Sequence, residues 1–438
     1  MSSKRPEGVK NMTIPVYLAL TFPYVLDIVE SKNFYCLRQN MDCSDSRLDT
    51  LVAGAQFDVC SYNAGMASRP HPSPLRFIFN AALPGGGTTP LFKVLLTNVC
   101  VNDCAYCANQ IGRDCPRFAF QPDELAKLFM ELHSKRLVKG LFLSSGVAGN
   151  ASRTQEKMIN VVEILRKRYE FKGYIHLKIL PGAPFDCVEA GCRLADRVSL
   201  NVEAPTAHHL SRLSSKKNLH EDIVERMRWI KQVMSNNQGL VPSGQTTQFV
   251  VGAAGETDRD ILHTTSALYN ELELRRVYFS AFSPVWRSPL EDLSPTSPHR
   301  EHRLYQADWL LRVYRFSSQE VELALGEKGD LPLTKDPKVL IAQRQPWLFP
   351  VDVNKARYDE LLRVPGIGPI SASKIIEARR DHSIFSLEQL KKMRVVTKRA
   401  APFIWFQGML PSERQSNFLP ELAEEIAPKT PSLAGCLR

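Results

Sequence analysis

Between Leu91 and Phe282, short apolar runs rich in β-forming residues alternate with segments whose apolar residues recur at helical spacing. This alternation is typical of βα units, in which consecutive strands lie parallel in one sheet. The predicted strands are Phe92–Thr97, Gly140–Leu143, Tyr174–Leu180, Arg197–Val202, Gln245–Val251 and Val277–Phe282. The predicted helices are Asp123–Leu137, Thr154–Tyr169, His220–Met234 and Asp258–Glu271. The pattern predicts an α/β fold, a partial (β/α)6 barrel whose reactive residues lie on the loops that follow the strands.

The composition fits a folded, multidomain protein. The chain has 438 residues, of which 44% are hydrophobic and 23% charged, which excludes a disordered, collagen-like or coiled-coil protein. Ten cysteines at irregular spacing in a chain of this length favour reduced thiols with a few metal ligands over a disulfide framework. The formal charge of +10 matters for function only where it is concentrated.

We divide the chain at shifts in composition. A Pro/Ser-rich stretch near residues 288–298 ends the barrel, and a further boundary lies near Pro346–Pro350. The expected parts are an N-terminal extension at 1–46, the barrel with its lead-in at 47–290, a connector with a packing helix at 291–350, a helical module at 351–406 and a tail at 407–438.

The N-terminal apolar run shows neither a membrane span nor an export signal. The run from Ile14 to Val29 is interrupted by two prolines and an aspartate, and it is shorter than the roughly 20 residues that a spanning helix needs. We therefore expect a cytoplasmic protein without a membrane partner. The first forty residues add nothing to the barrel, and we expect translation to begin at Met41.

Three cysteines follow the first predicted barrel strand at the spacing CxxxCxxC. Cys100, Cys104 and Cys107 can converge on one face of a tight loop and bind three irons of a 4Fe-4S cluster, which leaves the fourth iron open. The alternative is a structural zinc site completed by Cys115. A separate pair, Cys187 and Cys192, is expected to pack in the core, with ligation of an auxiliary cluster as the alternative.

The motif CxxxCx(aromatic)C after the first strand of such a barrel, with Tyr106 at the aromatic position, resembles the radical S-adenosylmethionine (SAM) superfamily. The resemblance implies a TIM-like partial barrel, a 4Fe-4S cluster and SAM as cofactors. It also implies that SAM is cleaved reductively to give a 5′-deoxyadenosyl radical that takes a hydrogen atom from the substrate. Ser144, Ser145 and Gly146 stand where family members carry a Gly-Gly-Glu-like turn that binds the SAM amino group, so this chain lacks the carboxylate of that turn.

Polar residues alternate with apolar ones in the third to fifth predicted strands, which places them on the inner face of the barrel. They are His176 and Lys178, then Ser199, Asn201 and Glu203, then Gln248. Inward polar side chains are costly unless they are paired or face a ligand, so we expect a polar cavity. Lys178 is the candidate for the SAM carboxylate or a substrate phosphate, and Glu203 for a SAM hydroxyl or amino group. The alternative is an internal salt bridge.

Residues 361–376 contain two apolar helical runs joined by the glycine turn Gly366-Ile367-Gly368, and they resemble a helix-hairpin-helix module. The resemblance implies that the backbone of this turn and the start of the next helix, with Ser371 and Lys374, bind a nucleic-acid phosphate without reading sequence. Residues 351–400 carry eleven Lys or Arg and six Asp or Glu, a net charge of +5. The alternative is protein docking or dimerisation. Arg394 replaces the first glycine of a second hairpin, which we expect to be structural or degenerate.

With both modules in this order, the chain resembles radical SAM proteins that are assigned to DNA modification or repair. The likeness covers roughly residues 47–405 and implies DNA, a reductant such as flavodoxin or ferredoxin, and a uracil-DNA-glycosylase-like protein as partners. We expect a radical SAM enzyme that modifies or repairs DNA. The alternatives are an RNA-modifying radical SAM enzyme and a non-catalytic DNA-binding adaptor with a structural or redox-sensing cluster.

Overall fold

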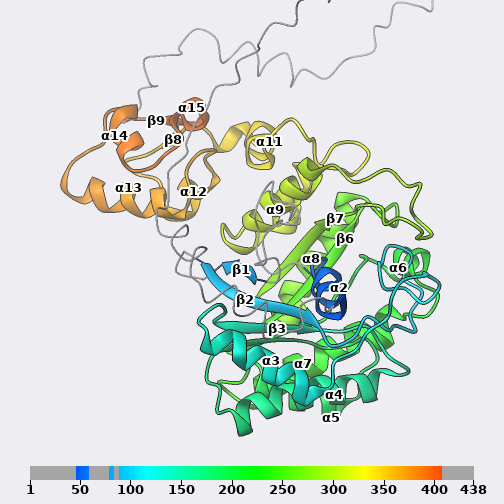
Figure 1. The fold of residues 1–438 in the computed structure, drawn as a ribbon. Coiled ribbons are helices and arrows are strands. Elements are labelled where there is room, and N and C mark those ends of the chain that lie inside the picture. Colours follow the sequence, from blue (N-terminus) through cyan, green and yellow to red (C-terminus); the bar gives the residue numbers. More distant parts are fainter. Residues whose placement is uncertain (1–45, 59–77, 83–87, 407–438) are drawn as a thin grey trace, which may run out of the picture. The chain divides into compact units, whose positions relative to one another are not determined.

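A computed structural model describes residues 46–58, 78–82 and 88–406 (Figure 1). Within these residues one sheet contains seven strands in chain order, β1 to β7. β1 pairs antiparallel with β2, and every later pair is parallel. The strands are β1 Ile78–Ala82, β2 Thr88–Leu95, β3 Gly140–Ser144, β4 Tyr174–Lys178, β5 Arg197–Ser199, β6 Gln245–Val251 and β7 Arg276–Ala281. The predicted α/β fold with an incomplete barrel is confirmed.

The six parallel strands, β2 to β7, coincide with the six predicted runs. β3 and β6 are buried along their whole length, as expected for strands with both faces covered. β1 was not predicted, because its five residues, IFNAA, lack the alternation that marks a half-buried strand. It extends the sheet by one antiparallel strand on the side of β2.

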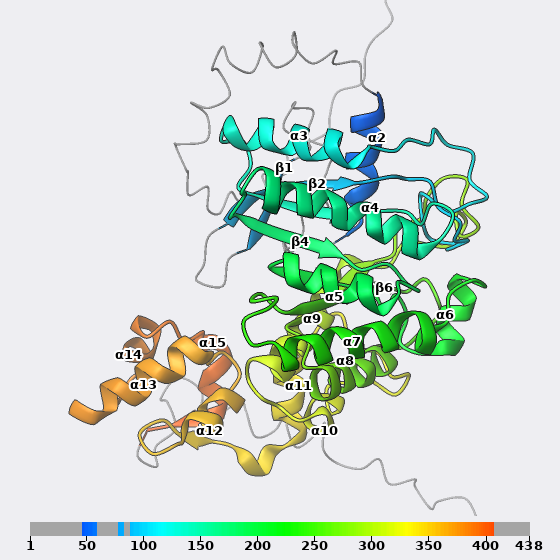
Figure 2. The same cartoon turned by 90° about the horizontal axis from the view of Figure 1, so that it is seen from below.

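Helices cover the outer face of the sheet, as Figures 1 and 2 show for α3, α4, α5 and α7. The helices of this layer are α3 Pro122–Ser134, α4 Ala151–Glu163, α5 Phe185–Leu194, α6 Ala207–Leu213, α7 Glu225–Asn236 and α8 Asp258–Leu272. Side-chain caps fix the starts of α4 and α8: Asn150 accepts from the Arg153 amide before α4, and Thr257 forms a capping box with Asp260 before α8. α4 packs on α5, and α5 packs on α7.

Three helices follow the sheet: α9 Pro298–Arg312, α10 Ser318–Glu322 and α11 Pro337–Arg344. α9 coincides with the expected packing helix and contacts both β7 and α8. The Tyr305 hydroxyl of α9 donates to the Phe279 carbonyl (3.0 Å) and accepts from the Phe279 amide (3.1 Å), which anchors the helix to β7. Asp308 is fully buried between Tyr269 and Arg312.

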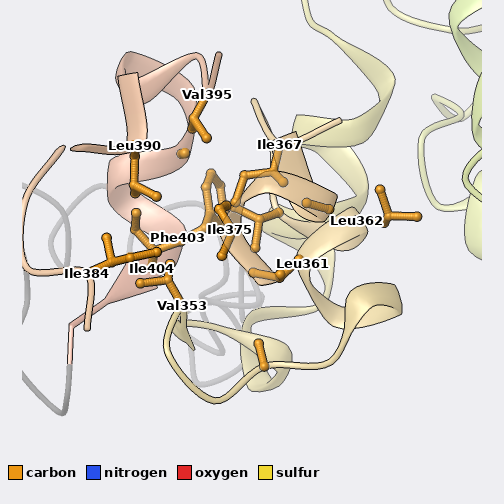
Figure 3. Close-up of a cluster of buried hydrophobic side chains, with 14 of the residues drawn as sticks. Val353, Leu361, Leu362, Ile367, Ile375, Ile384, Leu390, Val395, Phe403 and Ile404 are labelled. Atoms are coloured by element: carbon orange, nitrogen blue, oxygen red, sulfur yellow. The ribbon is translucent and has the colours of Figure 1, made fainter. Parts of the chain in front are cut away.

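The C-terminal module has its own hydrophobic core (Figure 3). Its elements are β8 Val351–Asp352, α12 Tyr358–Arg363, α13 Pro369–Asp381, α14 Leu387–Lys392, α15 Thr397–Ala400 and β9 Ile404–Trp405. β8 and β9 pair in parallel and bring the two ends of the module together. Leu361, Ile367, Ile375, Leu390 and Val395 meet in this core, so both hairpins contribute to one folding unit.

Among the described helices, none combines the length and the hydropathy needed to cross a lipid bilayer. Residues 1–45 of the expected N-terminal extension, the expected start at Met41 and the expected C-terminal tail at 407–438 lie outside the described residues.

Candidate functional site

The cysteine triplet and all the residues predicted to contact SAM line one cavity of about 200 Å³ at the C-terminal edge of the sheet. These residues are Cys100, Cys104, Tyr106, Cys107, Ser144, Ser145, Gly146, Lys178 and Glu203. The sequence did not single out two further lining residues, Asp58 from the segment before the sheet and Lys217 from the loop after α6. The chain therefore gathers thiols, hydroxyls, carboxylates and ammonium groups around one space.

The loop that carries the cysteines is held by the segment after α6. The Ala105 amide donates to the Leu213 carbonyl (2.8 Å), and the Lys216 ammonium donates to the Val101 carbonyl (2.7 Å). The Asp103 carboxylate accepts hydrogen bonds from the Ser214 hydroxyl and from the amide and hydroxyl of Ser215. Burial opposes ionisation of Asp103, but the hydrogen bonds from both serines outweigh it and lower its pKa to about 2. The carboxylate is therefore charged at neutral pH and fixes the loop.

The three thiols lie close enough for the charge on one to affect the pKa of another. Burial and the neighbouring Cys104 raise the pKa of Cys107 to about 12, and burial also raises the pKa of Cys104. Backbone amides point at two of the sulfurs: Val147 donates to Cys100 Sγ and Asn109 to Cys107 Sγ, each at 3.4 Å. Lys217 lies beside Cys104 and brings a positive charge to the thiols.

This donor set fits an iron-sulfur cluster. Soft thiolates supply three ligands, and amide donors with a nearby ammonium stabilise the negative charge of cluster sulfurs. Cys115 is not among the described residues that line the cavity. Nor, within residues 46–58, 78–82 and 88–406, are three or more His, Cys, Asp or Glu side chains arranged to hold a single metal ion.

The turn after β3 lies directly against the cysteine loop. Ser144 is buried, the Ser145 hydroxyl donates to the Gly146 carbonyl (2.7 Å), and the Gly146 amide donates to the Thr97 carbonyl (2.7 Å). A Cβ on Gly146 would lie 2.5 Å from the Val99 carbonyl oxygen, closer than packed atoms approach. Gly146 is therefore needed for the close approach of these two loops.

Glu203 carries a polar atom that the described residues leave unsatisfied. It is 6% exposed, and its Oε1 forms an ion pair with Lys217 at 3.2 Å, while its Oε2 is buried with no partner in the described chain. Its φ of 64° lies in the left-handed region, where a non-glycine residue is strained. Burial, together with Glu203 and the nearby thiols, raises the pKa of Tyr106 well above its usual value. An unsatisfied acceptor facing the cavity fits a ligand that donates a hydrogen bond.

Lys178 pairs with Asp58 (Nζ to Oδ1, 3.0 Å) and contacts Asn201, not Glu203. The internal salt bridges that were the alternative for Lys178 and Glu203 therefore exist, but each residue has a different partner. Burial raises the pKa of Asp58, yet the charges of Lys178 and Lys93 outweigh it and lower that pKa. Sequence reasoning missed Asp58 because it precedes the repeating strands, and no pattern links it to them.

His176, which shares the inward face with Lys178, is not among the described cavity residues. Its Nε2 lies 2.7 Å from the Ser199 hydroxyl, and its ring packs edge-on against Phe142. Burial, with Arg197, Lys178 and Lys93 nearby, lowers the pKa of His176 well below its usual value, so the ring is neutral. Gln248 does line the cavity, and its amide donates to the Phe57 carbonyl (2.9 Å).

Cys187 and Cys192 lie in α5 and are 3% and 1% exposed. Burial raises their pKa values to about 11 and about 12, as expected for thiols that pack in a core.

In the C-terminal module, Gly366 adopts φ 84°, and a Cβ there would lie 2.5 Å from the Val396 carbonyl oxygen of the second hairpin. Ile367 points into the module core, and its backbone amide donates to the Val364 carbonyl at 3.2 Å. Gly368 caps the start of α13, and Ser371 and Lys374 lie in the first turns of that helix. The second hairpin does form, with Arg394 at φ 66° where the first has glycine.

Lys338 of α11 is a contact of the first hairpin that sequence reasoning missed. Its ammonium donates to the Ile367 carbonyl at 2.6 Å, and its side chain is almost completely buried. Together with the Arg399–Asp336 ion pair (3.1 Å), this bond ties the hairpin turn to the connector.

Comparison with known families agrees with both modules. The radical SAM superfamily profile matches residues 94–268, and the helix-hairpin-helix motif profile matches residues 350–401. The described cavity contains the thiols that the first family requires, and this family implies a 4Fe-4S cluster and SAM.

Curated relatives match only parts of the chain. A tRNA-2-methylthio-N(6)-dimethylallyladenosine synthase of Clostridium perfringens is 26% identical over 170 residues, which is 38% of this chain and 37% of that protein. Biotin synthase of Acaryochloris marina is 22% identical and covers 52% of this chain and 61% of its own length. A threonylcarbamoyladenosine tRNA methylthiotransferase of Thermotoga maritima is 24% identical over 47% of this chain and 46% of its own. The chain thus spans less than two thirds of each of these relatives.

Among solved structures, the FeFe-hydrogenase maturase HydG from Carboxydothermus hydrogenoformans aligns with a TM-score of 0.41 at 12% identity, over 50% of each chain. Methylornithine synthase aligns with a TM-score of 0.39 at 15% identity, over 48% of this chain and 59% of its own. None of the three curated relatives is named for a link to a uracil-DNA glycosylase, so the expected partner of that kind gains no support. The chain thus contains a radical SAM domain and, C-terminal to it, a helix-hairpin-helix motif.

Proposed function

We propose that this protein is a radical SAM enzyme that modifies or repairs a base or sugar of DNA. The observation that carries the proposal is the presence of both modules in one chain, a radical SAM domain at 94–268 and a basic helix-hairpin-helix motif at 350–401. A hairpin of this kind offers phosphate contacts without sequence specificity. It suits an enzyme that must hold a nucleic-acid chain near a reactive cavity.

In this proposal Cys100, Cys104 and Cys107 would hold the cluster, and other residues that line the same cavity would hold SAM. The bound cluster and SAM supply a carbon-centred radical that can abstract hydrogen. Glu203 accepts a hydrogen bond from SAM through its unsatisfied Oε2, and Lys178 provides positive charge for a carboxylate or phosphate. Tyr106, Ser144, Ser145 and Gly146 complete the wall and exclude water from the reacting atoms.

The C-terminal module contributes phosphate binding. The first amides of α13 lack helical acceptors, and the predicted contact residues lie in the turn before this helix (Gly366, Ile367, Gly368) and in its first two turns (Ser371, whose side chain is buried, and Lys374). The net charge of +5 over residues 351–400 adds long-range attraction. Binding through these contacts weakens with salt by roughly 0.9 log units per log unit of salt for each phosphate neutralised on duplex DNA.

RNA is the second candidate substrate. It is favoured by the relatives from Clostridium perfringens and Thermotoga maritima, whose names assign them to tRNA modification. The parts of this chain that match them comprise less than half of it, so the choice between DNA and RNA falls to experiment.

The test uses the full chain, reconstituted anaerobically with iron and sulfide and reduced by dithionite or flavodoxin. We expect 5′-deoxyadenosine to form from SAM, and deuterium from labelled DNA to appear in it. Cys104→Ala is expected to abolish both SAM cleavage and deuterium transfer. Cys192 is a buried thiol of α5, and Cys192→Ala is expected to retain both activities. Transfer from RNA but not from DNA would favour the second candidate. Tight, salt-dependent DNA binding without any SAM cleavage would overturn the enzyme assignment in favour of an adaptor.

A further inference from the structure

Two loops meet beside the cavity that holds the cysteines. One leaves the cavity wall at Ala108 and Asn109, after the cysteine triplet, and the other leaves it at Phe282 and Ser283, after β7. Arg113 joins them: its Nε donates to the Trp286 carbonyl at 3.1 Å and its Nη1 to the Ala108 carbonyl at 2.7 Å. The position of Trp286 is thereby tied to the wall of the reactive cavity.

Trp286 is large, apolar and 68% exposed, and it already forms a defined stacking arrangement. The guanidinium carbon of Arg287 lies 4.1 Å from the centroid of the Trp286 ring. The backbone of Arg287 has a φ of 57°, which lies in the left-handed region. Its amide donates to Glu291 Oε2 at 2.7 Å. A strained backbone that is held in place next to a cavity is characteristic of a preorganised binding element.

We propose that Trp286, with Arg287 and Arg113, is a stacking platform for an unpaired nucleobase of the substrate; this inference rests on the proposed nucleic-acid function. An indole face stacks on any base, the Arg287 guanidinium beside it brings positive charge for an adjacent phosphate, and Arg113 holds the indole in place through two backbone carbonyls. Arg113 links the platform to Ala108 of the cavity wall, so we expect a base held there to place the neighbouring nucleotide toward the cavity. DNA and RNA share this chemistry, and it requires that the nucleotide be unpaired.

The experiment measures the affinity of the full reconstituted chain for labelled single-stranded DNA, single-stranded RNA and duplex DNA of one sequence by fluorescence anisotropy. Trp286→Ala is expected to weaken single-strand binding by about 10- to 100-fold, and Trp286→Phe by less, because a smaller ring still stacks. Trp229→Ala is the matched control. Trp229 also lies under an arginine, Arg226 at 4.6 Å, but on α7 in the outer helical layer.

The outcomes separate this inference from the proposed function. Single-strand binding that Trp286→Ala weakens and Trp229→Ala leaves unchanged supports the platform, and the preference between DNA and RNA identifies its source. Equal affinities of wild type and Trp286→Ala for all three ligands overturn the platform but leave the proposed function standing. Unchanged affinity with slower reduction of the cluster by flavodoxin would also overturn it and make Trp286 part of a protein-docking surface. Absence of nucleic-acid binding by the wild type contradicts the proposed function itself.

Discussion

Lys178 and Asp58 form an ion pair of 3.0 Å that joins β4 to the segment before the sheet. Both side chains are largely buried, so removal of one charge leaves the other without compensation in a poorly solvated place. Asp58→Asn is therefore expected to lower the free energy of unfolding by about 3 kcal/mol in denaturant titrations at pH 7. Glu189→Gln, which removes the exposed Arg193–Glu189 pair, should cost less than about 1 kcal/mol.

The Asp58 contribution also depends on pH. The folded protein lowers the pKa of Asp58 below 3.8, so the stabilisation is fully present above 3.8 and is lost as the pH falls through the lower folded value. The stability difference between wild type and Asp58→Asn should stay constant from pH 8 to pH 5 and shrink in more acidic solution. A constant difference throughout would contradict the assignment.

Gly146→Ala tests the close approach of the β3 turn to the cysteine loop. The new Cβ meets the Val99 carbonyl oxygen at 2.5 Å, and the loop must move away. We expect a loss of about 1–3 kcal/mol in stability together with a lower iron content after reconstitution. Gly149→Ala is the control: nothing lies within 4 Å of its Cβ, but its φ is 78°. It should be destabilised by backbone strain alone and retain its iron.

The buried Lys338 is expected to make the stability of the protein depend on pH in a second range. Burial lowers its pKa to about 7, and this outweighs the attraction of Asp336. Between pH 7 and 10.5 the unfolded chain binds a proton that the folded chain does not, so the stability of wild type rises relative to Lys338→Met as the pH increases. The expected slope is about 1.4 kcal/mol per pH unit in thermal or denaturant unfolding. Below pH 7 the difference in stability should not change with pH.

Gly366 and Arg394 occupy equivalent positions in the two hairpins, and substituting them is expected to change the melting temperature in opposite directions. Arg394 adopts φ 66°, which costs an L-residue roughly 1–2 kcal/mol, so Arg394→Gly should raise the melting temperature despite the greater flexibility of glycine. Gly366→Ala should lower it, because φ is 84° and the Cβ meets the Val396 carbonyl oxygen at 2.5 Å. A lower melting temperature for Arg394→Gly would mean that the arginine side chain contributes more than its backbone costs.

The repeating part of the fold could be predicted from the sequence, because buried parallel strands and amphipathic helices have distinct periods. Six strand predictions match β2 to β7, although the ends of β4 and β5 lie earlier than expected. The predicted strands extend too far because the loops after β4 and β5 contain buried apolar residues: Ile179, Leu180, Leu200 and Val202. In the sequence, apolar residues buried in a loop cannot be told from the continuation of a buried strand.

The cavity was only partly predictable. The cysteine spacing and the alternation in β4 identified Cys104 and Lys178, which line it. The partners Asp58 and Lys217 come from segments without a local pattern, and only the tertiary fold brings them to these residues. Likewise, alternation placed His176 beside Lys178 on one face, but depth along the strand decides which of the two reaches the cavity.

The anchoring of the cysteine loop has a consequence for how the protein is made. Asp103 finds its partners Ser214 and Ser215 more than a hundred positions later in the chain, and Ala105 depends on Leu213. During synthesis the three thiols emerge long before the residues that shape their loop. Iron and sulfide delivered to the nascent chain would meet flexible thiols, whereas delivery after α6 has emerged from the ribosome would meet a formed site. We therefore expect the cluster to be loaded only after the residues of α6 and the segment that follows it are in place.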